Sequence, residues 1–165
     1  MPHSETLLDE IDVEILSALQ KDGCIANAEL ANRVGMSQSA CLSRTKRLKE
    51  GGIIRSSVAI VDEESVGLGI AAFASVTLGR HDRDATETFL QRVEASPQVM
   101  ECYHVTGTAD YMLKIVAPDI SSFRDFLMDA LVPTPDISHI ESRIVLKTEK
   151  RSSELPLPDH SGRSR

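Results

Sequence analysis

Three short apolar patterns at helical spacing, each closed by glycine, occupy the first fifty residues and limit the possible folds most strongly. The first pattern comprises Leu8, Ile11, Ile15 and Leu19. It predicts a helix over about residues 8–21 with Asp9 as its N-cap, because the apolar side chains recur every three or four positions. Gly23 is the expected end of this helix, since glycine accepts the left-handed backbone conformation found there.

Two further helices are predicted in quick succession. Asn27 is the expected N-cap of a short second helix that Gly35 closes. Ser37 is the expected N-cap of a third helix over residues 38–50, which the glycines at 51 and 52 end. Only a few residues separate the last two helices, and this spacing is typical of a helix-turn-helix.

The pattern changes from helical to extended after Gly52. Residues 53–54 and 58–61 look extended and predict a strand and a connector. The elements predicted beyond them are a strand over 71–78, a helix over 83–95, strands over 99–106 and 111–116, a helix over 121–131 and a strand over 137–148. Their order, βαββαβ, is that of a ferredoxin-like domain. The expected fold class is therefore α+β.

The expected domains follow from these patterns. A helix-turn-helix DNA-binding domain would occupy residues 1–60, with its strand and linker reaching about residue 69. A ferredoxin-like domain would occupy residues 70–150. Residues 151–165 are rich in serine, proline and charge, and we expect a flexible tail there.

Charge is distributed unevenly along the chain. The 165 residues carry a formal net charge of −7, yet residues 33–55 contain six basic side chains and one acidic side chain, Glu50. A local basic segment, more than the total charge, is the electrostatic signature of DNA binding. The alternative interpretation is a solvated surface helix.

Composition excludes several other classes of protein. Apolar residues make up 41% of the chain and charged residues 26%, as in soluble globular proteins. No apolar run approaches the roughly 18 residues of a membrane span, and the first residues lack the layout of a signal peptide, so we expect a cytoplasmic protein without a membrane partner. Cys24, Cys41 and Cys102 are scattered, which argues against a disulfide framework and a zinc site. We expect neither metal nor cofactor.

The third helix has a face suited to DNA. Cys41, Thr45 and Leu48 share one side and would pack inward. The expected DNA contacts are Gln38, Ser39, Ser43, Arg44, Lys46, Arg47 and, beyond the helix, Arg55. Glutamine, serine and arginine side chains can pair with base edges, and the basic side chains at 46, 47 and 55 suit phosphates.

The order and spacing of several motifs resemble the Lrp/AsnC family of leucine-responsive and feast/famine regulators. The matching stretches are LDEID (8–12), ILSALQKDG (15–23), ELANRVGMS (29–37), CLSRTKRL (41–48), GII (52–54), VTGTADYMLK (105–114) and LKTEK (146–150). The resemblance implies a winged helix-turn-helix followed by a ligand-sensing domain. It also implies double-stranded DNA as a partner, and homodimers with two sheets packed face to face that assemble further, commonly to octamers.

In the family, small effectors, usually amino acids, bind between dimers near a glycine loop, which corresponds here to residues 107–111. The expected effector contacts are Gly107, Thr108, Ala109, Asp110 and His104. Two departures stand out: Thr45 replaces a bulky aliphatic residue, and Thr108-Ala109 replaces an acidic residue followed by an aromatic one. From the residues alone, Gly-x-x-Asp is also an ordinary hairpin connection in which Asp110 caps the turn.

The predicted function is that of a sequence-specific DNA-binding transcriptional regulator whose activity or assembly responds to a small effector, in particular an amino acid. The alternative is an architectural DNA-binding protein that needs no effector. An enzyme is not expected and no catalytic residue is predicted. The best catalytic cluster, His104 with Asp110 and Glu101, matches no nucleophile motif or metal-ligand spacing.

Overall fold

A computed structural model describes residues 8–80, 82–132, 134 and 136–158. The described chain divides into two compact units. The first, which we call the helical unit, combines residues 8–60 with residues 150–158. The second, the sheet unit, comprises residues 61–149. The first unit is helical and the second combines an antiparallel sheet with helices, so the expected α+β fold class is confirmed.

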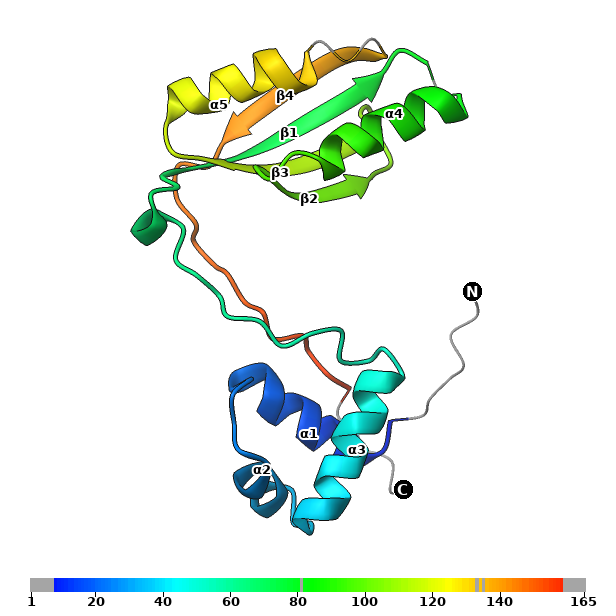
Figure 1. Cartoon of the computed structure of the whole chain (residues 1–165), viewed down its shortest axis with the longest axis vertical. Helices are drawn as coiled ribbons and strands as arrows, with labels where there is room; N and C mark the ends of the chain where they lie inside the picture. Colours follow the sequence, from blue (N-terminus) through cyan, green and yellow to red (C-terminus); the bar gives the residue numbers. More distant parts are fainter. Residues whose placement is uncertain (1–7, 81, 133, 135, 159–165) are drawn as a thin grey trace. The chain divides into compact units, whose positions relative to one another are not determined.

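The helical unit contains α1 (Glu10–Lys21), α2 (Asn27–Arg33) and α3 (Gln38–Glu50) (Figure 1). The predicted N-caps of α1 and α3 are confirmed, since Asp9 accepts from the Asp12 backbone N–H and Ser37 accepts from that of Ala40. The N-cap predicted for α2 is wrong. Asn27 is already helical, and its side-chain amide donates instead to the backbone carbonyl of Gln38, 2.9 Å away. This bond ties the start of α2 to the start of α3.

The turn between α2 and α3 depends on Gly35. Its φ of 66° lies in the left-handed region that favours glycine. The backbone N–H of Met36 donates to Ala31 and that of Gly35 to Asn32, so two carbonyls at the end of α2 are satisfied. This local closure reverses the chain and lets α3 begin at Gln38.

The core of the helical unit is small. Its buried apolar residues are Ile15, Leu16, Ala18, Leu30, Ala31, Val34, Cys41 and Leu48. Leu157 packs against them. The side chain of Gln20 accepts from the backbone N–H of Leu155 at 2.6 Å and donates to its carbonyl at 3.3 Å. Described residues beyond 150, which we expected in a tail, therefore contact α1. Residues 159–165 lie outside the described part of the chain.

The elements of the sheet unit follow the predicted βαββαβ order. They are β1 (Ile70–Leu78), α4 (Arg83–Glu94), β2 (Val99–His104), β3 (Tyr111–Ala117), α5 (Ile120–Phe126) with a π-helical continuation η2 (Leu127–Leu131), and β4 (Ile137–Ile144). A short 3₁₀ turn, η1 (Glu64–Val66), precedes them. The strands form one antiparallel sheet in the order β2-β3-β1-β4. Two βαβ halves interleave in this way in a ferredoxin-like fold.

Both helices of the sheet unit cover the same face of the sheet (Figure 1). Alternate residues of each strand point to this face, as the pleat of a strand requires. The buried core consists of Ala72, Ala74, Val76 and Leu78 from β1, Tyr111, Leu113, Ile115 and Ala117 from β3, and Phe89, Val93, Phe123, Phe126 and Leu131 from the helical segments. The other face of the sheet carries neither of these two helices, and the intervening strand residues point to it.

Two predicted strands need correction. Residues 58–61 form no strand within the described chain, because no neighbouring segment supplies a ladder, and their side chains are exposed. The strand predicted over 137–148 ends at Ile144. After Val145 donates to the carbonyl of Ala71, β1 has almost reached its first residue and has no further backbone to offer. Leu146 is accordingly 98% exposed.

Candidate nucleic-acid interface and ligand groove

The outward side of α3 presents the residues expected to contact DNA bases. Gln38, Ser39 and Ser43 are exposed near the start of the helix, and Lys46 is exposed further along. Cys41 and Leu48 are fully buried on the opposite side. The helix therefore offers a free polar face at its N-terminal end, which is the part of a recognition helix that meets base edges.

Two arginines of α3 converge on one carboxylate. Asp12 on α1 is buried, with its side chain 1% exposed. Arg44 donates from Nη1 to Oδ1 of Asp12 at 2.9 Å, and Arg47 donates from Nη2 to Oδ2 at 2.6 Å. The side chain of Arg44 is 25% exposed and that of Arg47 53% exposed. The two arginines thus differ: Arg44 is largely engaged within the protein, whereas half of Arg47 faces outward.

Asp9 completes the network at the start of α1. Its carboxylate caps the Asp12 backbone N–H, and Asp12 reaches back to the Asp9 backbone N–H at 3.4 Å, forming a capping box. Arg44 Nη1 also pairs with Asp9 Oδ2. This hydrogen bond is the main reason that the pKa of Asp9 lies below its usual value and that of Arg44 above its own. The cluster of Asp9, Asp12, Arg44 and Arg47 is called the aspartate–arginine network below.

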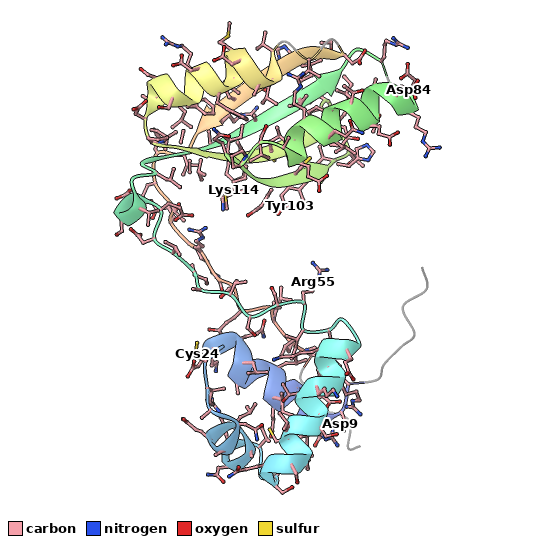
Figure 2. All side chains as sticks on the ribbon, viewed as in Figure 1. Asp9, Cys24, Arg55, Asp84, Tyr103 and Lys114 are labelled. Carbon is pink, nitrogen blue, oxygen red and sulfur yellow. The ribbon has the colours of Figure 1, made fainter. Side chains whose placement is uncertain are left out.

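Arg55 lies beyond α3, on the segment that leaves the helix (Figure 2). The backbone N–H groups of Ile53 and Ile54 both donate to the carbonyl of Leu48, so the chain turns at the helix end before it reaches Arg55. The side chain is exposed. It is therefore accessible to a phosphate, as its predicted role requires.

The uncovered face of the sheet carries large and charged side chains. Figure 2 shows Tyr103 and Lys114 on the side of the sheet away from α4 and α5. Glu101 accepts from the Tyr103 hydroxyl at 2.6 Å and pairs with Lys114 at 3.3 Å. Bonding to Glu101 is the main reason that the pKa of Tyr103 is raised, so the phenol stays protonated. Phe73, in the middle of β1, is 38% exposed on this face.

A groove of about 830 Å³ lies on the same face of the sheet. Its lining comprises Ser75, Thr77, His104, Val105, Thr106, Thr108, Ala109, Met112, His139, Glu141 and Arg143. These residues come from all four strands and from the connection between β2 and β3. The volume falls in the range that is typical of small-molecule sites.

The polar groups of the groove include an ion pair that the sequence analysis did not single out. Arg143 Nη2 lies 2.8 Å from Oε1 of Glu141, and both side chains are more than half exposed. His139, Glu141 and Arg143 alternate along β4 and so share one face. The sequence did contain a signal for this polar strand face, because polar side chains recur at every second position of the predicted strand.

The predicted effector residues separate into two groups. His104, Thr108 and Ala109 line the groove, and His104 stacks on Tyr111 with ring centroids 4.9 Å apart. Gly107 and Asp110 are not among the lining residues. Gly107 has a φ of 120°, which explains why glycine stands at the tip of the connection.

Asp110 holds the connection to β1. Its Oδ2 accepts from the backbone N–H of Leu78 at 2.8 Å, and its own N–H donates to the carbonyl of Val76. Its carbonyl accepts from Val105. The side chain thus fastens the groove rim to the sheet, which matches the turn-capping role that the residues alone suggested.

No metal site was found in the part of the chain that the structure describes, since no three histidine, cysteine, aspartate or glutamate side chains gather there. Across the same residues, none of the helices is long and apolar enough to cross a membrane.

Comparison with known proteins accounts for both units. Residues 8–55 match a winged helix-turn-helix DNA-binding family, and residues 71–155 match the Lrp/AsnC ligand binding domain. The chain is 45% identical to transcriptional regulator AzlB of Bacillus subtilis over 153 residues, covering 93% of this chain and 98% of that protein. It is 36% identical to the leucine-responsive regulatory protein of Escherichia coli K12 over 148 residues, or 90% of each chain.

Solved structures of related regulators agree with these sequence matches. A transcriptional regulator of Neisseria meningitidis in complex with L-methionine has a TM-score of 0.86 and 39% identity, covering 90% of this chain and 96% of that one. The feast or famine regulatory protein of Mycobacterium tuberculosis with L-methionine has a TM-score of 0.81 and 30% identity, covering 90% and 98%. The chain belongs to the Lrp/AsnC family of transcriptional regulators.

Membership in the Lrp/AsnC family confirms the predicted function class. The chain is a DNA-binding transcriptional regulator with a ligand-binding domain, and the family is one of regulators rather than enzymes. The polar face of α3 belongs to its DNA-binding region and the groove to its ligand-binding domain.

Proposed function

We propose that this Lrp/AsnC regulator reads DNA with α3 and Arg55, binds an amino acid in the groove of the sheet unit, and works as a homodimer or larger homo-oligomer whose assembly changes with the amino acid. The groove's lining carries the second part of the proposal. It combines a carboxylate, a guanidinium and several hydroxyl groups within one small-molecule-sized space.

The proposed DNA contacts divide by chemistry. Gln38, Ser39 and Ser43 would meet base edges, because they are exposed at the start of α3 and carry hydrogen-bonding groups that discriminate bases. Lys46 and Arg55 would bind phosphates. Both are exposed at or beyond the later part of the helix, where backbone contacts position a recognition helix.

The two arginines of the aspartate–arginine network receive different roles. Arg47 would also bind a phosphate, since half of its side chain is exposed. Arg44, first expected at the DNA, is assigned instead to holding α3 against α1. Its guanidinium already bonds both Asp9 and Asp12 and is mostly covered.

An amino acid suits the groove because its two charges match the Glu141–Arg143 pair. The carboxylate would accept from the ammonium group, and the guanidinium would donate to the ligand carboxylate in a charge-assisted bond. Thr77, Ser75 and the rim residue Thr108 add hydroxyl groups, while Val105 and Met112 add apolar surface for a side chain. Two related regulators were solved with L-methionine, which makes methionine the first amino acid to test.

The uncovered sheet face is the proposed contact between subunits. Phe73 and Tyr103 are exposed on it beside the groove, and exposed aromatic side chains are enriched at protein interfaces. A second copy seated on this face would cover the groove. Ligand and partner would then share neighbouring residues, so that binding of the amino acid shifts the assembly equilibrium, and assembly shifts the affinity for the amino acid by the same factor.

The test begins with genomic fragments. Purified full-length protein is used to select fragments of the source genome with and without a pool of amino acids. Recovery of a few fragments, changed by the pool, supports a ligand-responsive regulator. Recovery that ignores the pool contradicts the amino-acid response and supports the architectural alternative. No enrichment at low salt overturns the assignment of α3.

Thermal unfolding then locates the ligand. A ligand bound only by the folded form stabilises it by RT ln(1 + [L]/Kd), about 2.7 kcal/mol at 100 times the Kd. Methionine and the other amino acids are tested singly on wild type, Arg143→Ala and the control Arg124→Ala, whose guanidinium pairs with Asp125 on α5 outside the groove. Loss of the shift in Arg143→Ala alone supports the groove, and a shift that survives in that variant contradicts it.

A further inference from the structure

Asp12 is an unusual residue for the core of a small helical unit. It is the one charged residue among the buried side chains of the described chain, and its carboxylate accepts from three donors: Arg44, Arg47 and the backbone N–H of Asp9. A buried carboxylate stays charged at moderate cost only when such partners surround it. Both arginines come from α3, so the first turn of α1 holds the DNA-reading helix by its charges.

The bond to Asp12 constrains how Arg47 can meet DNA. The guanidinium donates to Asp12 through Nη2 at 2.6 Å. Among the described residues, Asp12 is the one hydrogen-bond acceptor of this side chain, so Nε and Nη1 remain for an external partner. A guanidinium is a planar fork that can bind two groups at once, whereas a lysine ammonium on the same stem is a flexible point charge. One nitrogen of Arg47 is therefore held by Asp12, while about half of the side chain is exposed.

We propose that Asp12 is a positioning residue for DNA binding: it holds one edge of Arg47, so that the opposite edge is aimed at a phosphate before DNA arrives. This inference rests on the proposed phosphate contact of Arg47. Arg44 supports the arrangement from the other oxygen of the same carboxylate. Orientation of the side chain in advance removes part of the entropy cost of ordering it in the complex.

The positioning role and simple electrostatics predict opposite effects on DNA binding when the charge of Asp12 is removed. Removing the charge of Asp12 raises the local positive charge, which by itself would strengthen binding to any DNA. Loss of positioning would instead weaken binding to a selected site, where the register of phosphates is fixed. The two effects are separated by comparing a fragment recovered by genomic selection with a random-sequence duplex of the same length.

The experiment measures Kd for both duplexes over a range of salt concentrations, using full-length Asp12→Asn, Arg47→Ala and the double variant. Glu14→Gln is the matched control, because it removes one negative charge from an exposed position of α1. We expect Asp12→Asn to raise the Kd of the selected fragment about 10-fold, the loss of one hydrogen bond to a charged group. We expect the random duplex to behave as in Glu14→Gln, and Asp12→Asn to change the Kd by less than about 2-fold in the Arg47→Ala background.

Arg47→Lys keeps the proposal testable if Asp12→Asn fails to fold. It retains the charge and the aliphatic stem but cannot bond Asp12 and a phosphate through one planar group. We expect a folded variant with unchanged binding to the random duplex and a Kd for the selected fragment raised about 5-fold. Wild-type affinity of Arg47→Lys for the selected fragment would overturn the proposal.

The remaining outcomes distinguish this inference from the function on which it rests. Arg47→Ala should flatten the dependence of log Kd on log salt by about 0.9 per DNA-bound subunit. An unchanged slope removes the phosphate contact and the inference together. A flattened slope supports the phosphate contact. The positioning role alone is then overturned by either of two results: Asp12→Asn has an undiminished effect on Kd in the Arg47→Ala background, or it weakens binding to both duplexes equally.

Discussion

The helical unit and the sheet unit solve the problem of a small core in different ways. The sheet unit buries Phe89, Tyr111, Phe123 and Phe126 between its two helices and the sheet. Its one buried polar side chain among the described residues, Thr134, bonds the local carbonyl of Ala130. The helical unit has no aromatic residue in its core and buries a carboxylate instead. Apolar area stabilises the sheet unit, whereas the helical unit depends on charge pairs as well. The unit that reads DNA is therefore the one whose fold is coupled to its arginines.

The largest expected effect tests the apolar side of this comparison. Phe89→Ala removes a fully buried ring that lies 4.8 Å from that of Tyr111, centroid to centroid. Because the cavity it leaves is enclosed, we expect the sheet unit to lose about 3–5 kcal/mol of unfolding free energy. Urea unfolding followed by circular dichroism measures the loss. Binding of the proposed amino-acid ligand should fall with it, and a loss below about 1 kcal/mol would show that the core repacks easily.

The second effect tests the charged side. Arg44→Met keeps the stem but removes the guanidinium, leaving Asp12 with Arg47 as its only described side-chain partner. We expect the helical unit to lose about 1–3 kcal/mol, the cost of leaving a buried charge less well satisfied. Arg124→Met is the control, because its partner Asp125 is exposed and surface pairs contribute about 0–1 kcal/mol. Equal effects of the two substitutions would remove the distinction drawn between the units.

A third, smaller effect asks which unit the segment after residue 150 stabilises. Leu157 is half-buried against the helical core. Leu157→Ala should lower the stability of the helical unit by about 1 kcal/mol, in keeping with partial loss of buried apolar area. Hydrogen exchange of the backbone amides of α1 and β3 locates the change. Faster exchange in β3 with α1 unchanged would contradict the assignment.

The smallest expected effect is on the pH dependence of folding stability. Since Arg44 lowers the pKa of Asp9 below its ordinary value of 3.8, this pair stabilises the folded state fully above that value, and its contribution disappears as the pH falls through the lowered pKa. Asp9 is 49% exposed, so we expect Asp9→Asn to cost less than about 1 kcal/mol at neutral pH and nothing in strong acid. Thermal unfolding between pH 2 and pH 7, roughly spanning this range, measures it.

The effect of salt distinguishes an aspartate stabilised by a charged partner from one stabilised by backbone N–H groups. The pKa of Asp119 in the sheet unit is also lowered, mainly by the backbone N–H of Ser122 rather than by a charged partner. Added salt should therefore reduce the effect of Asp9→Asn more than that of Asp119→Asn, because screening weakens the attraction between full charges most. The same salt dependence for both variants would contradict the attribution to Arg44.

Sequence signals predicted those elements whose ends depend on nearby residues. The range of α3 follows from Ser37 before it and the glycine after it, and the structure has the helix over Gln38–Glu50 as predicted. Residues 58–61 had the composition of a strand, but a strand also needs a partner, which local pattern does not report. The early end of β4 has the same cause, since it depends on where β1 begins.

The candidate site likewise combines features that nearby residues determine with features that depend on distant residues. The exposure of Gln38, Ser39 and Ser43 follows from helical periodicity and was predicted. The inward engagement of Arg44 depends on Asp12, which lies 32 positions earlier in the chain, and helical spacing within α3 contains no information about it. The place of Glu141 and Arg143 in the groove lining depends on the register of β4 beside β1, which the local sequence does not give.

The contact between Gln20 and Leu155, which spans 135 positions, has a consequence for how the chain folds during synthesis. The ribosome releases α1, α2 and α3 first, and domains tend to fold in the order in which they emerge. The last described partner of α1, however, is translated only after the whole sheet unit. The DNA-binding helices therefore lack their contacts with Leu155 and Leu157 until the residues that follow the sheet unit have been synthesised.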